Sequence, residues 1–221
     1  MTKEEIAAMI DVSAVQAENT LADIDECVKL ATEYDVSAVF ALPANIPYLK
    51  AKIAQTGKHI AMASVVGFPG GGETSHIKEE TARELVELGC DEVDMVNNLT
   101  WLKAGDHDRY VEDVRSVVRG AGGKPVKVII ECHWLSDEEI VRACEWSVEG
   151  GASWVKTGTG WTPTGATPER VALMKKTVGD RAQVKAAGGV RSLETLVELY
   201  ELGARRFGVG VKRVREILAQ A

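Results

Sequence analysis

The sequence predicts an α/β protein that folds as a TIM (β/α)8 barrel, with a single domain over residues 1–221. Eight short β-type runs alternate with helical patterns from one end of the chain to the other. The central runs are continuously apolar, as expected for parallel strands that are buried on both faces. No linker, low-complexity segment or block of like charge divides the chain. Eight strand–helix units favour a closed barrel over an open doubly wound sheet.

The predicted strands are rich in apolar and β-branched residues and are bounded by turn residues. The first of them is the weakest. In chain order they are Met9–Ser13, Ala38–Leu42, Ile60–Gly67, Glu92–Asn97, Val126–Cys132, Trp154–Thr157, Gln183–Ala186 and Arg206–Val209.

The predicted helices begin at capping residues, and several end at glycine. Thr20 and Ser136 are N-caps, Ser136 within a capping box, and Pro168 occupies a first helical position. Gly89 and Gly203 follow helix ends. In chain order the helices are Thr20–Tyr34, His76–Leu88, Asp106–Arg119, Ser136–Glu149, Pro168–Val178, Ser192–Leu202 and Lys212–Ala219.

Composition limits the possible partners and compartments. The net charge of -7 and the pI of about 5.3 argue against general binding to nucleic acid or to anionic membranes. No apolar run is long enough to cross a bilayer, and the first residues are typical of a helix start rather than a signal peptide. The cysteines form no C-x-x-C pair, and the histidines lack zinc-ligand spacing. We therefore expect a cytoplasmic protein with no metal, nucleic-acid or membrane partner.

Two lysines indicate chemistry. Lys156 and Lys185 each lie in a β-type run among apolar residues, just before glycines. Burying a lysine in such a strand is costly unless its charge has a use. Burial and a neighbouring ammonium both lower the pKa of a lysine, and a neutral amine can attack a carbonyl carbon. The alternative is that both lysines are solvated strand ends.

Asp94 lies in the fourth predicted strand, where residues 92, 94 and 96 share one face. If this face points into the barrel, the carboxylate requires a cation, and Lys156 and Lys185 are the candidates. A structural salt bridge would explain the same pattern. Active sites of these barrels lie at the carboxyl ends of the strands. The other polar residues near these ends are Asp11, Asn97, Glu131, Thr157 and Thr159.

Glycines follow the seventh and eighth predicted strands, as Gly188-Gly189 and as Gly208 and Gly210. This corner of a barrel commonly binds phosphate, because backbone N–H groups can approach the phosphate oxygens and a helix N-terminus supports the charge. Tight turns between strand and helix are the alternative explanation.

Over nearly its whole length the chain resembles the deoxyribose-phosphate aldolases, which are class I (Schiff-base) enzymes on a (β/α)8 barrel. The segments that carry the likeness include Glu92–Val96, Val128–Glu131, Val155–Gly160 and Val184–Gly189. The resemblance implies that Lys156 is the Schiff-base lysine and that Lys185 lowers its pKa. It implies that Asp94 is the acid/base carboxylate, which works with a bound water. The substrate-binding residues would be Asp11, Thr159, Gly160, Gly188, Gly189, Gly208 and Gly210.

The resemblance also implies a reaction. Family members cleave 2-deoxy-D-ribose 5-phosphate reversibly to acetaldehyde and D-glyceraldehyde 3-phosphate, with no metal or organic cofactor. The expected partners are small-molecule aldehydes and sugar phosphates, and the expected assembly is a homodimer.

Parts of the family pattern are replaced in this chain. The family phrase Cys-Val-Asn-Pro is Phe40-Ala41-Leu42-Pro43, and a usual lysine after the first strand is Gln16. Gly158 stands where serine is common, and Gly210-Val211 replaces a serine pair that helps to bind phosphate.

These departures leave three possibilities open. Backbone groups of the glycines, with Lys212 or Arg213, could hold the phosphate in place of the serines. The same lyase chemistry could act on a different or unphosphorylated aldehyde or sugar. Finally, the chain could be a non-catalytic barrel that binds a sugar phosphate.

Overall fold

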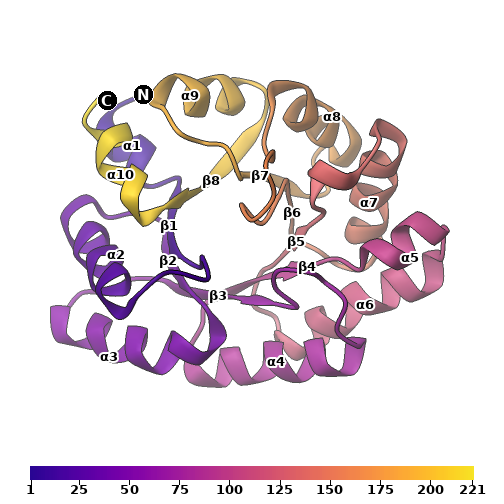
Figure 1. Cartoon of the computed structure of the whole chain (residues 1–221), viewed down its shortest axis with the longest axis horizontal. Coiled ribbons are helices and arrows are strands. Elements are labelled where there is room, and N and C mark those ends of the chain that lie inside the picture. The colour runs from indigo at the N-terminus through magenta and orange to yellow at the C-terminus, as the bar shows by residue number, and fades with distance from the viewer.

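The computed structural model describes residues 1–221 and contains a closed barrel of eight parallel strands (Figure 1). Each strand pairs with the next along the chain, and β1 pairs with β8 to close the barrel. This confirms the predicted fold class. The strands are β1 (Ile10–Ala14), β2 (Ala38–Ala41), β3 (Met62–Val66), β4 (Glu92–Val96), β5 (Val126–Ile129), β6 (Trp154–Lys156), β7 (Gln183–Ala187) and β8 (Ala204–Gly210).

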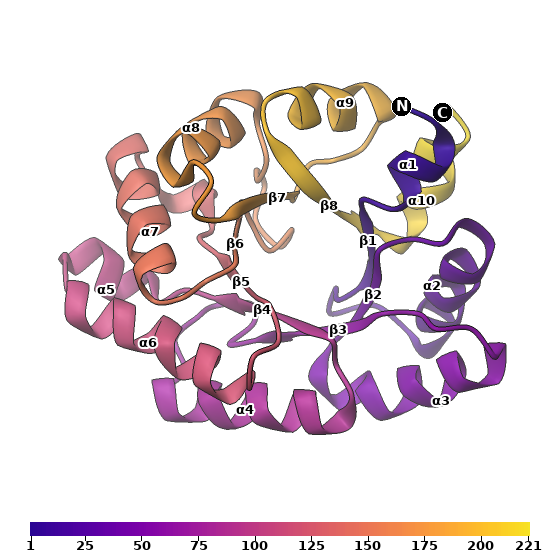
Figure 2. The ribbon, with the colours of Figure 1, turned by 180° about the vertical axis from the view of Figure 1, so that it is seen from behind.

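Helices surround the barrel on all sides, and the view from behind shows α1 next to α10 with both chain termini beside them (Figure 2). None of the helices combines the length and apolar character needed to span a bilayer. The helices are α1 (Lys3–Ala7), α2 (Leu21–Tyr34), α3 (Ile46–Thr56), α4 (Ser75–Leu88), α5 (Leu99–Ala104), α6 (His107–Gly120), α7 (Asp137–Glu149), α8 (Pro168–Val178), α9 (Leu193–Glu201) and α10 (Val211–Leu218).

Besides α1, where the sequence indicated only a helix start, two helices lie outside the predicted set. In α3 only Ile46 and Leu49 are buried, and Asn45 makes no side-chain cap hydrogen bond, so both usual helix signals are weak. The other, α5, has six residues, too few for a helical period to show.

The observed strand ends differ from the predicted ones by up to three residues, and the fifth and eighth strands show why. The prediction that the fifth strand reaches Cys132 was wrong, because Glu131 has the left-handed φ of 54° and a 3-10 turn follows at Cys132–Trp134. The eighth strand begins earlier than predicted, at Ala204, where its pairing with β7 begins.

Successive side chains of a strand point to opposite faces. One face of each strand therefore packs against the surrounding helices, and the other points into the barrel. Outward-facing residues such as Val93 and Met95 belong to the large apolar core shared with the helices. Their neighbours Glu92 and Asp94 are buried on the inner face. The inside of the barrel therefore contains charged side chains, and these form the candidate active site.

Candidate active site

Seven charged side chains from six strands meet inside the barrel. Three are carboxylates and four are cations, and every one of them makes an ion pair within the group. They are Asp11, Glu92, Asp94, Lys127, Lys156, Lys185 and Arg206.

The three residues expected to be catalytic form one row. Lys156 Nζ donates a hydrogen bond to Asp94 Oδ2 at 2.8 Å, and Lys185 Nζ donates to the same oxygen at 2.7 Å. Lys185 Nζ also lies 2.6 Å from Asp11 Oδ2. A single carboxylate oxygen is thus shared by two lysines. Asp11, which is expected to bind substrate, also pairs through its carboxylate with Lys185 and Arg206.

Three residues outside the predicted site complete the cluster. Lys127 Nζ lies 2.7 Å from Glu92 Oε1 and 3.4 Å from Asp94 Oδ1. Arg206 donates hydrogen bonds to Asp11 Oδ1 and Glu92 Oε1, the latter at 2.6 Å. Strand periodicity carries a signal for two of them, because Glu92 precedes Asp94 by two residues and Arg206 precedes Gly208 by two.

The ion pairs form a closed ring of alternating charge. In order around the ring the side chains are Asp94, Lys127, Glu92, Arg206, Asp11 and Lys185, which contacts Asp94 again. The ring is neutral when all six groups are charged. Lys156 lies outside it, as a pendant group on Asp94. Because an uncompensated buried charge is expensive, Lys156 is the cation that the cluster can most easily lose to deprotonation.

The pKa values of the two lysines move in opposite directions. Burial is the largest influence on Lys156, and together with the Lys185 ammonium it lowers the pKa of Lys156 to about 8 against the pull of Asp94. Burial also opposes the charge on Lys185, but Asp11 and Asp94 outweigh it and raise the pKa of Lys185. Burial would raise the pKa of Asp94, yet Lys156, Lys185 and Lys127 hold it well below its usual range. Lys156 is therefore the amine that becomes neutral near physiological pH.

A cavity of about 240 Å³ gives access to this amine. The Lys156 side chain is 8% exposed, whereas those of Lys185 and Asp94 are 1% and 0% exposed. Lys185 also lines the cavity, but Lys156 is the more accessible of the two amines to a substrate carbonyl. All the residues predicted to bind substrate line the cavity, namely Asp11, Thr159, Gly160, Gly188, Gly189, Gly208 and Gly210.

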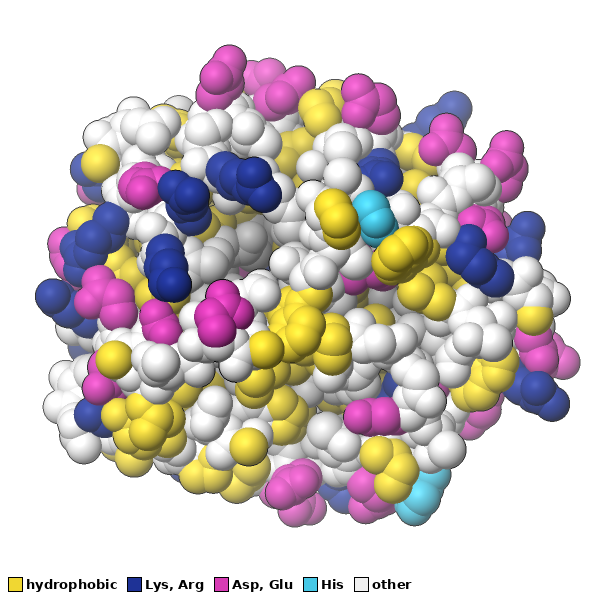
Figure 3. Space-filling model, in the orientation of Figure 1, with side chains coloured by type: hydrophobic (Ala, Val, Ile, Leu, Met, Phe, Trp, Pro, Cys, Tyr) yellow, Lys and Arg dark blue, Asp and Glu magenta, His cyan; other side chains and the backbone are white.

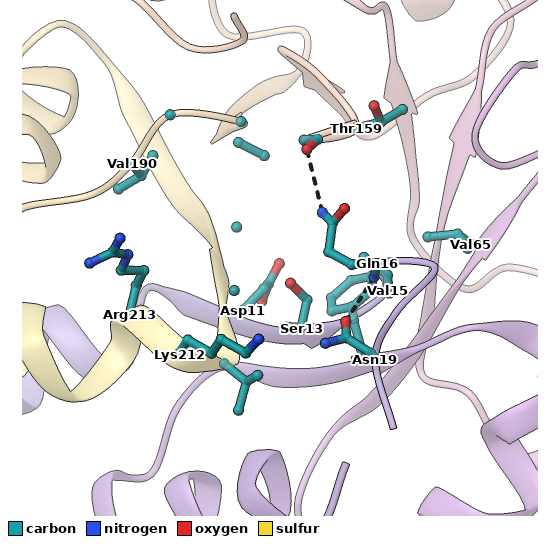
Figure 4. Close-up of a pocket in the computed structure, with 18 of the residues that line it drawn as sticks. Asp11, Ser13, Val15, Gln16, Asn19, Val65, Thr159, Val190, Lys212 and Arg213 are labelled. Atoms are coloured by element: carbon teal, nitrogen blue, oxygen red, sulfur yellow. Dashed lines mark hydrogen bonds between the residues drawn. The ribbon is translucent and has the colours of Figure 1, made fainter. Parts of the chain in front are cut away.

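The two sides of the cavity differ in character. Val15, Phe40 and Val65 form one side, and Figure 4 shows Val65 across the cavity from Arg213. Basic side chains line the other side and gather beside the hollow in Figure 3. The basic residues on this side are Arg191, Lys212 and Arg213. The sequence predicted Lys212 and Arg213 as possible phosphate ligands, but not Arg191.

The backbone on the basic side is free to receive an anion. Gly188 and Gly189 have φ of 76° and 123°, which side chains rarely tolerate. None of the N–H groups from Gly188 to Arg191 donates a hydrogen bond within the chain. Helix α10 starts at Gly210 without a side-chain cap. Unpaired N–H groups, a helix N-terminus and cations together suit a phosphate group.

A buried carboxylate holds the loop between β6 and α8. The hydroxyl of Thr159 donates to Glu131 Oε2 at 2.5 Å, and the Thr162 hydroxyl donates to Oε1 at 3.1 Å. Thr159 lines the cavity, but its hydroxyl hydrogen is committed to Glu131. A Cβ at Gly158 would lie 2.8 Å from Glu131 Oε1, so glycine at this position leaves room for the carboxylate.

The chain matches the DeoC/LacD family of aldolases over residues 5–219. It is 44% identical over 220 residues to a deoxyribose-phosphate aldolase of Klebsiella pneumoniae, an alignment that covers 99% of this chain and 88% of the relative. It is 43% identical over 208 residues to a deoxyribose-phosphate aldolase of Methanothermobacter thermautotrophicus, covering 94% and 92%.

Solved structures agree with these matches. The deoxyribose phosphate aldolase of Aeropyrum pernix, described as tetrameric, superposes with a TM-score of 0.90 at 26% identity, covering 99% of this chain and 92% of that one. The match in sequence extends over nearly the whole barrel and includes the strands that carry the ionic ring. The chain belongs to the DeoC/LacD family of aldolases.

Proposed function

We propose that this protein is a class I aldolase that cleaves 2-deoxy-D-ribose 5-phosphate to acetaldehyde and D-glyceraldehyde 3-phosphate, and that also catalyses the reverse reaction. The observation that carries the proposal is Lys156, a buried amine with a pKa of about 8 that lines the cavity and is the most exposed of the clustered lysines. Its relatives are named for this activity.

The reaction begins when neutral Lys156 attacks C1 of the open-chain sugar and forms a carbinolamine. Loss of water gives a protonated imine, which serves as an electron sink. Removal of the proton from the C3 hydroxyl then breaks the C2–C3 bond and releases glyceraldehyde 3-phosphate. The bonding electrons move into the imine and leave an enamine on Lys156. Protonation at C2 and hydrolysis release acetaldehyde and restore the amine.

Asp94 is suited to relay protons with a water molecule, because it contacts both lysines. Its pKa is low while the surrounding ammonium groups are charged. When Lys156 is neutral, one of these positive charges disappears and the basicity of Asp94 rises. Such proton transfer typically contributes about 10² to 10⁴ in rate.

The phosphate would bind at the basic side of the cavity. The free N–H groups from Gly188 to Arg191, with Lys212 and Arg213, take over the role of the serines that Gly210-Val211 replaces. The substrates are small molecules. We also expect a homodimer, which sedimentation would distinguish from a tetramer such as that described for the Aeropyrum pernix enzyme.

Reductive trapping tests the proposal. Borohydride in the presence of acetaldehyde should add one ethyl group, located at Lys156 by peptide mass spectrometry. The matched control is Lys156→Arg, which keeps the positive charge but cannot form the imine, and should lose both the adduct and the cleavage of 2-deoxyribose 5-phosphate. An unmodified Lys156, or an active Lys156→Arg enzyme, would exclude the mechanism. Equal kcat/KM for 2-deoxyribose and its 5-phosphate would instead indicate an unphosphorylated substrate.

A further inference from the structure

One aromatic ring lies against three ammonium groups of the site. Phe40, from β2, is 2% exposed and lines the cavity. Its ring centroid lies 4.0 Å from Lys185 Nζ, 5.5 Å from Lys127 Nζ and 5.8 Å from Lys156 Nζ. A cation over an aromatic face is attracted most strongly when both are desolvated. The ammonium groups therefore hold the ring in place.

The ring is part of a continuous apolar wall. Phe40, Val15 and Val65 belong to one small hydrophobic cluster, separate from the main core, and all three line the cavity. The remaining buried members of the cluster are Ala38 and Ala63. Figure 4 shows Val15 and Val65 away from Arg213 and Val190.

This placement gives the two ends of a substrate different surroundings. The basic side with its free N–H groups attracts the phosphate, which belongs to the glyceraldehyde 3-phosphate half. The half bound to Lys156 then lies nearest to Phe40, the cavity-lining aromatic ring closest to this amine.

We propose that Phe40 sets the size of the donor aldehyde, with Val65 as a second element of the same wall; this inference rests on the proposed Schiff-base function. The two-carbon unit attached to Lys156 packs its methyl group against the ring. An additional carbon on that methyl group would meet a ring that cannot move aside, because the lysines fix it. Acetaldehyde is therefore accepted as the donor and longer aldehydes are disfavoured.

Hydrogen–deuterium exchange in D2O tests this role without any acceptor. Each cycle of enamine formation breaks a C–H bond next to the carbonyl and reprotonation forms a C–D bond, which NMR detects. The measured quantity is the ratio of exchange rates for propanal and acetaldehyde. A methylene group in an apolar pocket typically changes specificity by 10- to 200-fold. Phe40→Ala should raise the ratio by about tenfold or more, and Val65→Ala should raise it by a smaller factor.

Phe207→Ala is the matched control, because it removes a buried ring from β8 that faces the main core and lines no part of the cavity. Its exchange ratio should equal that of the wild type. Val65→Ala keeps the test decisive if Phe40→Ala fails to fold. Normal acetaldehyde exchange with an unchanged ratio in the variants would overturn the role of Phe40 alone. Absence of exchange and of borohydride trapping in the wild type would overturn the Schiff-base function itself.

Discussion

Two buried lysines of this barrel lie in ionic clusters that differ in composition and access. Lys78 of α4 donates to Asp113 Oδ2 of α6 at 2.6 Å and to the Val96 carbonyl at 3.0 Å, and its side chain is fully covered. Lys156 also donates to a buried carboxylate at a similar distance, but it opens into the cavity. Burial lowers the pKa of both lysines.

The comparison separates a structural ion pair from a reactive amine. Lys78 and Asp113 form a pair of one cation and one carboxylate, and the Ser75 hydroxyl donates to the remaining oxygen of Asp113. Lys156 shares its carboxylate with Lys185 and is the cation in excess of a neutral ring. A lowered pKa alone therefore does not identify a lysine as a nucleophile. Lys156 is identified by two further features: a second lysine competes for its carboxylate partner, and its side chain is open to the cavity.

The largest expected effect comes from breaking the buried ion pair between Lys78 and Asp113. Lys78→Met leaves Asp113 buried without its cation, which typically destabilises a protein by about 3 to 5 kcal/mol. Urea unfolding should show this loss, while the folded enzyme still forms the adduct at Lys156. The double variant Lys78→Met/Asp113→Leu should recover much of the stability, because replacing a whole buried pair by apolar groups is often neutral. A single variant as stable as the wild type would contradict the assignment.

A smaller effect is expected from removing Lys185, which shares the Asp94 carboxylate with Lys156. Because the reaction requires the neutral amine, kcat/KM of the wild type should rise with pH through about 8. The Lys185 ammonium lowers the pKa of Lys156, so Lys185→Met should raise it and move the rising limb to higher pH. A shift of about one unit reduces kcat/KM about tenfold at pH 7.

The pH profile distinguishes this effect from simple damage to the site. Lys212→Met removes an exposed cation at the cavity rim, and it should weaken binding of the phosphorylated substrate without moving the limb. If the limb of Lys185→Met coincided with that of the wild type, Lys185 would have no electrostatic role in activating Lys156.

The smallest effect is expected at the basic side of the cavity. A Cβ at Gly210 would have no atom within 4 Å, so Gly210→Ser should be accommodated without strain. The new hydroxyl adds a donor for the phosphate, worth about 0.5–1.5 kcal/mol, and KM for 2-deoxyribose 5-phosphate should fall by a few fold. KM for unphosphorylated 2-deoxyribose should not change. An equal fall for both sugars would place the phosphate elsewhere.

Most of the fold could be predicted from the sequence, because the local signals for strands and helix starts agree with the barrel as a whole. Strands such as Glu92–Val96 are apolar on their outer face, and Thr20 and Ser136 form the capping boxes that start α2 and α7. Helix α3 was missed because tertiary packing, rather than a capping residue or a broad apolar stripe, keeps it in place.

The site was only partly predictable for a different reason. Lys156, Lys185 and Asp94 share phrases with a known family, and the structure brings them together. The ring depends on how far each strand is staggered against its neighbours, which sequence periodicity does not specify. Hence the ion pairs that Lys127 and Arg206 make in the ring could not be predicted, although each is a charged residue in a buried strand.

The ionic ring has a consequence for how this protein can evolve. Its members connect β1, β4, β5, β7 and β8 across the space that apolar side chains usually fill, so they join the barrel together as well as supporting Lys156. A change at Glu92 or Lys127, neither of which lines the cavity, alters the charge balance that the nucleophile experiences. Mutational improvement of stability and of turnover cannot proceed independently at these positions. Adaptation to new substrates is therefore expected at the open rim, where Gly210 and Val211 already depart from the family pattern.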